Sequence, residues 1–153
     1  MLHSLSEIVT KATELKTKDE KIEWLRKNDS IPLKTVLKYM YDPSVEFLIP
    51  NTPPPWKKNG YIGVEGMLYK ETRRLRIFIK GGGYDQLEQV KREQLFISLL
   101  EDVDDNDAEL LVKMITQKPL KGLSRAVVAE AFPDIQLATE DKNANAEGTK
   151  KNG

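Results

Sequence analysis

The sequence contains no cysteine and only one histidine, His3, which stands near the N-terminus. Without cysteine the chain can form no disulfide, no thiolate metal site and no cysteine nucleophile. A lone histidine at a terminal position also argues against histidine-centred catalysis and zinc ligation. We therefore expect a protein that is not an enzyme and that has no catalytic residues, no cofactor and no metal.

Long apolar runs are missing as well. No stretch approaches the ~18–20 apolar residues of a membrane helix, and the start MLHSLSEIV lacks the basic and then apolar order of a secretory signal. These absences predict a cytoplasmic protein with no membrane partner. The 153 residues, with 39% hydrophobic and 31% charged side chains, are typical of one globular domain.

The charges cancel in total but are segregated along the chain. The 24 basic and 24 acidic residues give a net charge of zero, so only local charge can point to nucleic acid. Residues 57–80 hold seven bases against two acids, and 101–109 form an acidic run without a base. More bases follow at Lys113, Lys118, Lys121 and Arg125. This pattern predicts either one basic and one acidic face of the molecule or merely the solvated faces of separate helices.

Apolar spacing and capping residues predict a mainly α, compact multi-helix bundle. The expected helices cover residues 5–15, 17–28, 30–41, 84–101, 106–115 and 124–131. Thr17 with Glu20 forms a capping box, and Ser30 and Ser124 are typical N-caps. Asn106 with Glu109 suggests a further cap, and Pro133 ends the last helix.

Two segments do not fit this pattern. Four prolines within residues 50–55 make the stretch 50–60 irregular. Residues 61–80 are ambiguous, because Leu75, Ile77 and Ile79 alternate as in a strand while the wider spacing also fits a helix. Gly81–Gly83 end this segment, and no Lys-Ser/Thr pair follows them as it would in a phosphate loop.

The end of the chain is polar and has no periodicity. From Gln136 onward it lacks aromatic residues, which predicts a disordered tail at 136–153 after one helical domain at 1–135. Within that domain, Trp24 is expected in the core. Trp56 either packs on the neighbouring proline rings or forms a surface contact.

The acidic run 101–109 raises the question of a cation site. It lacks the order of carboxylates and the turn glycine of a calcium loop. We therefore interpret it as helix ends and caps.

The loop before the last expected helix is the strongest candidate site. Unsatisfied amides at a helix N-terminus bind phosphate oxygens. Here Gly122 allows close approach, Ser124 offers a hydroxyl, and Lys118, Lys121 and Arg125 add positive charge. Such a site would hold a nucleic-acid backbone without reading its sequence. The alternative is an ordinary capped loop with solubilising lysines.

Three stretches, residues 5–29, 33–49 and 110–133, resemble in order the N-terminal helical DNA-binding domain of ATP-dependent DNA ligases, especially those of bacteriophages. The resemblance implies a bundle that holds duplex DNA across the minor groove through phosphate contacts from helix-terminal loops. It places Lys121, Gly122, Leu123 and Ser124 on such a loop, with Lys118 and Arg125 beside it. It implies a second such loop at Thr17-Lys18, and it favours helix for residues 61–80. Segment 57–85 departs most from the resemblance.

The rest of a ligase is not expected here. No Lys-x-Asp-Gly motif occurs, and 153 residues leave no room for adenylation and OB domains. The resemblance therefore implies a stand-alone accessory protein, as a phage might encode, acting in the host cytoplasm.

Two hypotheses about function follow. In the first, the protein binds double-stranded DNA without sequence preference, through the two loops and a basic face to which Lys57, Lys58, Arg73 and Arg74 also belong. In the second, the fold docks on a replication, transcription or host-defence protein through the acidic run 101–109 or the Pro-Trp loop 50–58.

Overall fold

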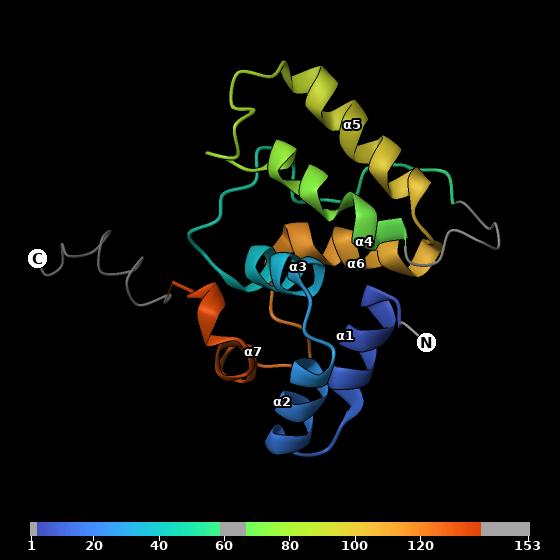
Figure 1. The fold of residues 1–153 in the computed structure, drawn as a ribbon. Coiled ribbons are helices and arrows are strands. Elements are labelled where there is room, and N and C mark those ends of the chain that lie inside the picture. The colour runs from blue at the N-terminus through green and yellow to red at the C-terminus, as the bar shows by residue number, and fades with distance from the viewer. Residues whose placement is uncertain (1–2, 59–66, 139–153) are drawn as a thin grey trace, which may run out of the picture.

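The computed structural model describes residues 3–58 and 67–138 and is mainly helical, which confirms the predicted fold class (Figure 1). The α-helices are α1 Leu5–Glu14, α2 Lys18–Lys27, α3 Ile31–Tyr41, α4 Met67–Glu71, α5 Gln89–Asp102, α6 Asp105–Thr116 and α7 Arg125–Ala131. Two 3₁₀ helices, η1 Thr72–Phe78 and η2 Pro133–Ile135, complete them. Within the described ranges no helix is long and apolar enough to cross a membrane.

The expected N-caps of α2, α3 and α7 are confirmed. Thr17 accepts from the Glu20 amide while the Glu20 carboxylate accepts from the Thr17 amide, so two otherwise unsatisfied donors are bonded. Ser30 accepts from Leu33 N at 3.1 Å, and Ser124 accepts from Val127 N at 3.2 Å. A second capping box, at Ser4 and Glu7, opens α1.

Residues 67–78 are helical, so the strand interpretation of this part was wrong. The first six residues of the ambiguous segment, 61–66, lie outside the described residues. Leu75 and Phe78 are fully buried on one side of η1. Among residues 67–80, Ile79 alone takes part in a β-bridge, with Phe47. The three-residue spacing of Leu75 and Phe78 therefore decides the structure here, rather than the alternation of Leu75, Ile77 and Ile79.

The helix predicted from Tyr84 begins five residues later, at Gln89. Arg92, which is buried with an exposed fraction of 2%, causes this later start of α5. Its guanidinium donates to the carbonyls of Ile77 at 2.7 Å, Tyr84 at 3.1 Å and Leu87 at 3.0 Å. Those contacts hold the chain before Gln89 in turns, because a buried guanidinium needs acceptors.

Helix α6 begins two residues earlier than the Asn106–Glu109 pattern predicted. Its N-cap is Asp104, whose carboxylate accepts from Asn106 N at 2.8 Å and Asp107 N at 2.9 Å. An aspartate is as good a cap as an asparagine, and its charge also favours the positive end of the helix.

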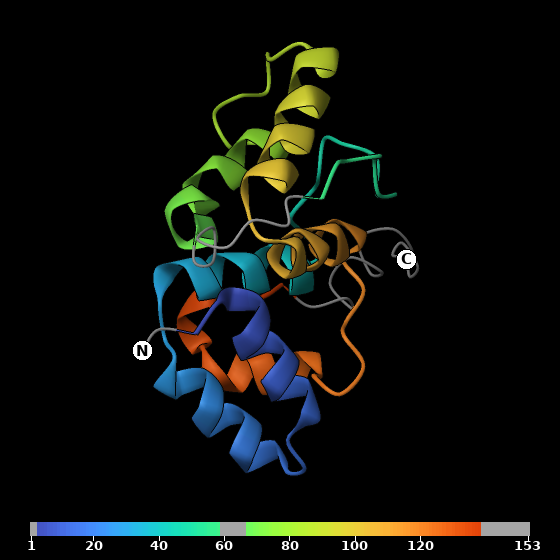
Figure 2. The same cartoon turned by 90° about the vertical axis from the view of Figure 1, so that its right-hand side faces the viewer.

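The helices are arranged around α3 and α6, which cross the middle of the molecule and pack against each other. Helices α1, α2 and α7 lie on one side of this pair, and α4, η1 and α5 lie on the other, as both views show (Figures 1 and 2). Fully buried side chains from both halves, among them Leu25, Leu37, Leu68 and Leu111, belong to one apolar core.

The two tryptophans both pack against this core and are only partly buried. Trp24 donates from Nε1 to the Ile8 carbonyl at 2.9 Å, and the Lys11 ammonium lies 4.1 Å from its ring centre. The Nε1 atom of Trp56 is buried without a hydrogen-bond partner. Trp56 therefore packs against the core, whereas the sequence predicted either packing on the proline rings or a surface contact.

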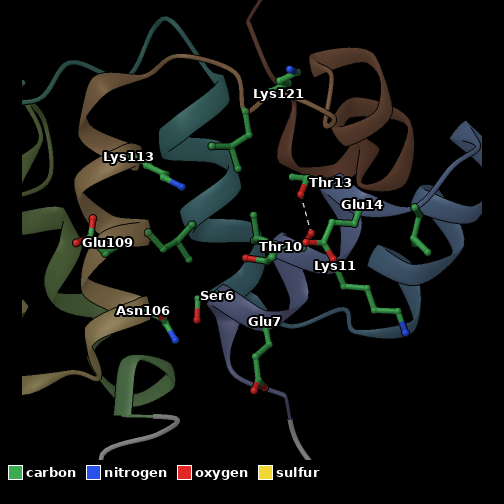
Figure 3. A pocket seen from close by; sticks show the side chains of 14 residues that line it. Ser6, Glu7, Thr10, Lys11, Thr13, Glu14, Asn106, Glu109, Lys113 and Lys121 are labelled. Atoms are coloured by element: carbon green, nitrogen blue, oxygen red, sulfur yellow. Dashed lines mark hydrogen bonds between the residues drawn. The ribbon is translucent and has the colours of Figure 1, made fainter. Parts of the chain in front are cut away.

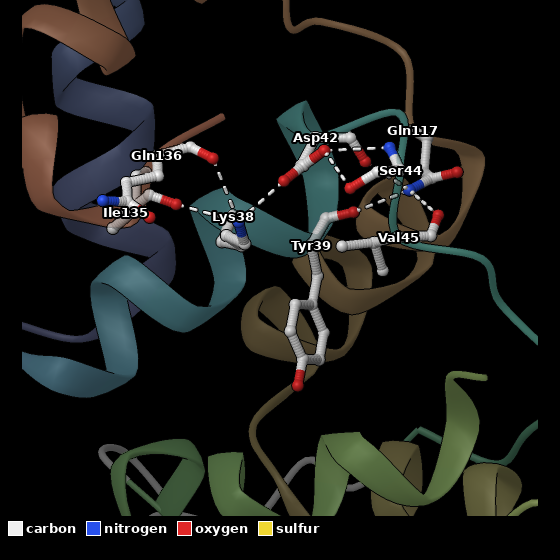
Figure 4. A network of polar contacts seen from close by, with 8 residues as sticks. All are labelled: Lys38, Tyr39, Asp42, Ser44, Val45, Gln117, Ile135 and Gln136. Atoms are coloured by element: carbon white, nitrogen blue, oxygen red, sulfur yellow. Dashed lines mark hydrogen bonds and ion pairs between the residues drawn. The ribbon is translucent and has the colours of Figure 1, made fainter. Parts of the chain in front are cut away.

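A polar network holds the end of α3 against the start of the C-terminal segment (Figure 4). The Lys38 ammonium lies 2.7 Å from an Asp42 oxygen and donates to the Ile135 carbonyl at 2.8 Å. Burial alone would raise the pKa of Asp42, but hydrogen bonds from Lys38 and Ser44 lower it below its ordinary value. Leu137, two residues past the predicted end of the helical domain at residue 135, is partly buried and packs against the core. Residues 139–153 of the predicted tail lie outside the described residues.

Candidate nucleic-acid interface

The loop before α7 packs on the end of α1 and on α2, and it lines one pocket with Lys18 of the other predicted DNA-contacting loop, about one hundred residues away in sequence. Gly122 has φ +88°, and a Cβ on it would lie 2.4 Å from the Thr13 carbonyl oxygen. Only glycine adopts this conformation readily and leaves room for so close an approach. The Lys21 ammonium donates to the Gly122 carbonyl. The end of α1 and the start of α2 therefore form one surface with the loop before α7.

A pocket of about 410 Å³ opens on this surface. Its lining contains three lysines, Lys16, Lys18 and Lys21, and no acidic residue. Leu120, Gly122, Leu123, Ser124 and Val127 complete it. We call it the lysine pocket. Ammonium groups around a hollow favour a phosphate or another compact anion, because each can donate hydrogen bonds as well as attract charge.

Acidic groups border the lysine pocket without lining it. Lys18 pairs with Glu130 of α7 at 3.0 Å, and both side chains are more than half exposed. The Glu20 carboxylate accepts from the amides of Lys16 and Thr17 at 3.2 Å each. Part of the positive charge is thus balanced, while Lys16 lies in the exposed turn.

The amides at the start of α7 contribute less than the sequence suggested. This helix has only seven residues, and its cap already bonds Ser124 Oγ to the Val127 amide. The Ser124 hydroxyl keeps its own proton for donation. The lysines therefore supply most of the attraction for an anion.

Leu123 is an anchor of the loop rather than a contact residue. Its side chain is 1% exposed, and its carbonyl accepts from the Tyr41 hydroxyl at 2.7 Å. The same hydroxyl accepts from Leu120 N at 3.0 Å. Burial raises the pKa of Tyr41 to about 12, although the Leu120 amide acts in the opposite direction. Tyr41 therefore stays protonated and ties the loop to α3.

The other predicted DNA-binding residues are distributed unevenly. Lys118 and Lys121 are exposed on the loop, and Arg125 is half-buried at the start of α7. Lys57 and Lys58 are exposed after the proline segment, where the Lys57 amide bonds Glu101 at 2.8 Å, and Arg73 is exposed on η1. Arg74 pairs with Glu71 at 2.9 Å and lies 3.6 Å from Asp102.

The structure does not bring the two basic blocks together. Helix η1 and the segment before Lys58 lie in the half of the molecule that contains α5, whereas the loop before α7 lies in the other half (Figures 1 and 2). The single basic face expected from both blocks was therefore wrong. The lysine pocket remains as the candidate site.

Lys16 and Lys21 were missed in the sequence analysis. Lys18 and Lys21 are three residues apart, which places them on one face of α2, and Lys16 precedes the cap. That spacing was visible in the sequence. The approach of these lysines to Gly122 depends on tertiary packing and could not be predicted from the sequence.

A larger groove of about 880 Å³ runs beside the lysine pocket, between α1 and α6 (Figure 3). Val9 and Leu110 are buried in its lining, and Leu120 lines both hollows. Thr10, Thr13, Asn106 and Lys113 face it from the two helices, and Lys121 lies at the end nearest the loop.

The acidic side chains of the run 101–109 serve largely to cap a helix and to make contacts within the fold. Asp104 caps α6, Asp102 lies near Arg74, and Asp107 is fully buried with its Oδ1 accepting from Ser6 N at 2.9 Å. No group of three acidic or histidine side chains in residues 3–58 and 67–138 is arranged to hold a metal ion. The interpretation of the run as helix ends and caps is confirmed for Asp104.

A comparison with protein families gives one match, over residues 8–121, to a model described as a family of unknown function (DUF6433). The chain belongs to DUF6433. No curated protein and no solved structure matches it.

The DUF6433 match includes the three lysines of the pocket and Lys121, and it ends at that residue. Leu120 of the pocket also lies within the match, whereas helix α7 and the pocket residues from Gly122 onward lie beyond it. The family description assigns no chemistry to these residues. The function proposed below therefore rests on their geometry.

Proposed function

We propose that this DUF6433 protein is a non-catalytic, sequence-nonspecific double-stranded DNA-binding accessory protein that holds the phosphate backbone at the lysine pocket. One observation carries the proposal. Lys18 and the segment Gly122–Ser124, which belong to the two loops that the ligase resemblance assigned to backbone contact, line one hollow together with Lys16 and Lys21. The resemblance to the ligase domain supports the same partner.

The expected mode of binding follows from the residues present. Ammonium groups attract phosphates and displace their counterions, so the affinity should fall steeply as salt rises, while base sequence matters little. The side chains that line the pocket lack the guanidinium and amide forks that read base edges.

The test is a salt titration of binding to intact duplex, nicked duplex and single-stranded DNA. The double variant Lys16→Glu/Lys18→Glu, at two lysines of the pocket, should weaken binding to all duplexes by about tenfold or more and reduce the slope of log affinity against log salt by about two. Both side chains are exposed, so the fold should survive, which circular dichroism can verify.

The matched control is Lys70→Glu/Lys91→Glu, which changes the net charge equally on exposed helix positions in the other half of the molecule. It should change affinity much less. A further variant, Lys58→Glu/Arg73→Glu, tests the second basic block. Equal losses in all three variants would mean that total charge, not the pocket, governs binding, and the proposed site would be wrong.

A further inference from the structure

We propose that the DNA-binding surface continues from the lysine pocket, across Lys121, into the groove between α1 and α6 as far as Lys113. The inference rests on the proposed function and identifies further binding residues for it. It also assigns a role to the groove of about 880 Å³ between α1 and α6.

The two hollows are joined at the loop before α7. Leu120 lines both of them, and Lys121 lines the groove while Gly122, the next residue, lines the lysine pocket. The close contact between Gly122 and Thr13 holds the loop at this junction. A strand seated on the lysines would therefore meet the end of the groove next.

The end of the groove near this junction suits a sugar-phosphate strand. Lys113 extends from α6 toward the space between the helices, and Lys121 lies on the loop above it (Figure 3). The facing wall carries the neutral hydroxyl side chains of Thr10 and Thr13, of which Thr13 already donates to the Thr10 carbonyl at 2.6 Å. Neutral polar groups can bond phosphate oxygens and sugars without adding charge, and they make many of the positioning contacts in protein–DNA complexes.

Three glutamates limit the surface. Glu7 and Glu109 line the part of the groove farther from Lys121, near Asn106, where they would repel phosphates and end the contact (Figure 3). Glu14 lines the groove beside Thr13, at the end of α1 closest to the loop. Its charge opposes that of Lys113 and Lys121, so we infer that it holds the affinity below the value that the lysines alone would give.

Two single variants test the inference in the same salt titration. Lys113→Gln should lower the affinity for duplex DNA several-fold and reduce the salt slope by about one. Glu14→Gln should raise the affinity several-fold at low salt. A gain in affinity cannot result from a damaged fold. Glu14→Gln therefore tests the inference even if Lys113→Gln destabilises α6.

The matched controls are Lys91→Gln on α5 and Glu23→Gln on α2, which make the same changes of charge at exposed helix positions outside the groove. They should bind with nearly unchanged affinity and slope. If Lys113→Gln and Glu14→Gln behave like these controls while Lys16→Glu/Lys18→Glu loses binding, the extension into the groove is wrong and the proposed function stands. If the unaltered protein shows no salt-dependent binding to any DNA, the proposed function itself is wrong.

Discussion

Asp107 shows at the scale of one residue how burial changes an ordinary acid. Its carboxylate is fully buried where α6 meets the start of α1, and one of its oxygens has no hydrogen-bond partner. Burial raises the pKa of Asp107 from 3.8 to about 6, and nearby Asp104 adds to the effect, while the Ser6 amide opposes it. The folded protein therefore binds a proton at this site more tightly than the unfolded chain does.

The sign of the pH dependence follows from that difference. The contribution of Asp107 to stability is complete below about pH 4 and is lost as the pH rises through about 6. At pH 8 the buried charge costs free energy, and each pKa unit corresponds to about 1.4 kcal/mol.

The first stability prediction concerns Asp107→Asn. The amide keeps an oxygen to accept from Ser6 N but carries no charge, so the free energy of unfolding at pH 8 should rise by about 1 kcal/mol or more. The difference should shrink toward pH 4. Urea unfolding at both values measures it, with Glu109→Gln, an exposed carboxylate on the same helix, as the control. A variant less stable than the unaltered protein at pH 8 would refute this account.

At the scale of elements, helix starts are decided by side chains within three residues of the cap. Ser4, Thr17, Ser30 and Ser124 each accept a backbone amide of the first turn, and Asp104 accepts two. Because these bonds are local, the sequence pattern located three of the five caps correctly. The sequence pattern placed the N-cap of α6 at Asn106 instead of Asp104, because both residue types are common N-caps.

The second stability prediction is a test of the cap of α2. Thr17→Ala removes the oxygen that accepts from Glu20 N and should lower the free energy of unfolding by about 1 kcal/mol. The control Thr10→Ala, at an exposed position within α1, should be neutral or slightly stabilising, since alanine has the higher helix propensity. Equal losses from both changes in urea unfolding would show that the cap contributes little.

At the scale of the whole molecule, Tyr41 connects the core to the candidate site. The hydroxyl donates to the Leu123 carbonyl and accepts from the Leu120 amide, across about eighty residues of sequence. Helix α3 thereby determines where the loop before α7 lies, and the loop in turn closes the lysine pocket.

The third stability prediction follows from this link. Tyr41→Phe leaves the Leu120 amide and the Leu123 carbonyl without that partner and should lower the free energy of unfolding by about 1–3 kcal/mol. Hydrogen exchange of the Leu120 amide should accelerate, and DNA affinity should fall although no charge has changed. Tyr39→Phe, on the same helix with a partly buried ring, is the control. An unchanged exchange rate at Leu120 would show that the loop does not depend on Tyr41.

The same scale explains where sequence reasoning failed. The Arg92 guanidinium donates to four carbonyls that precede α5 and so delays the start of this helix, an effect that periodicity within 84–101 cannot reveal. Similarly, the basic blocks at 57–80 and 118–125 looked like parts of one face until packing placed them in different halves of the molecule.

The amino-acid sequence by itself determined the helical class, most helix boundaries and the loops that hold candidate contact residues, because apolar spacing and capping act over one or two turns. Only the tertiary structure decided which charges share a surface. It brought Lys16, Lys18 and Lys21 to Gly122 and separated them from Arg73 and Arg74. The physical reason is that electrostatic attraction depends on distance in space, and packing around α3 and α6 sets that distance.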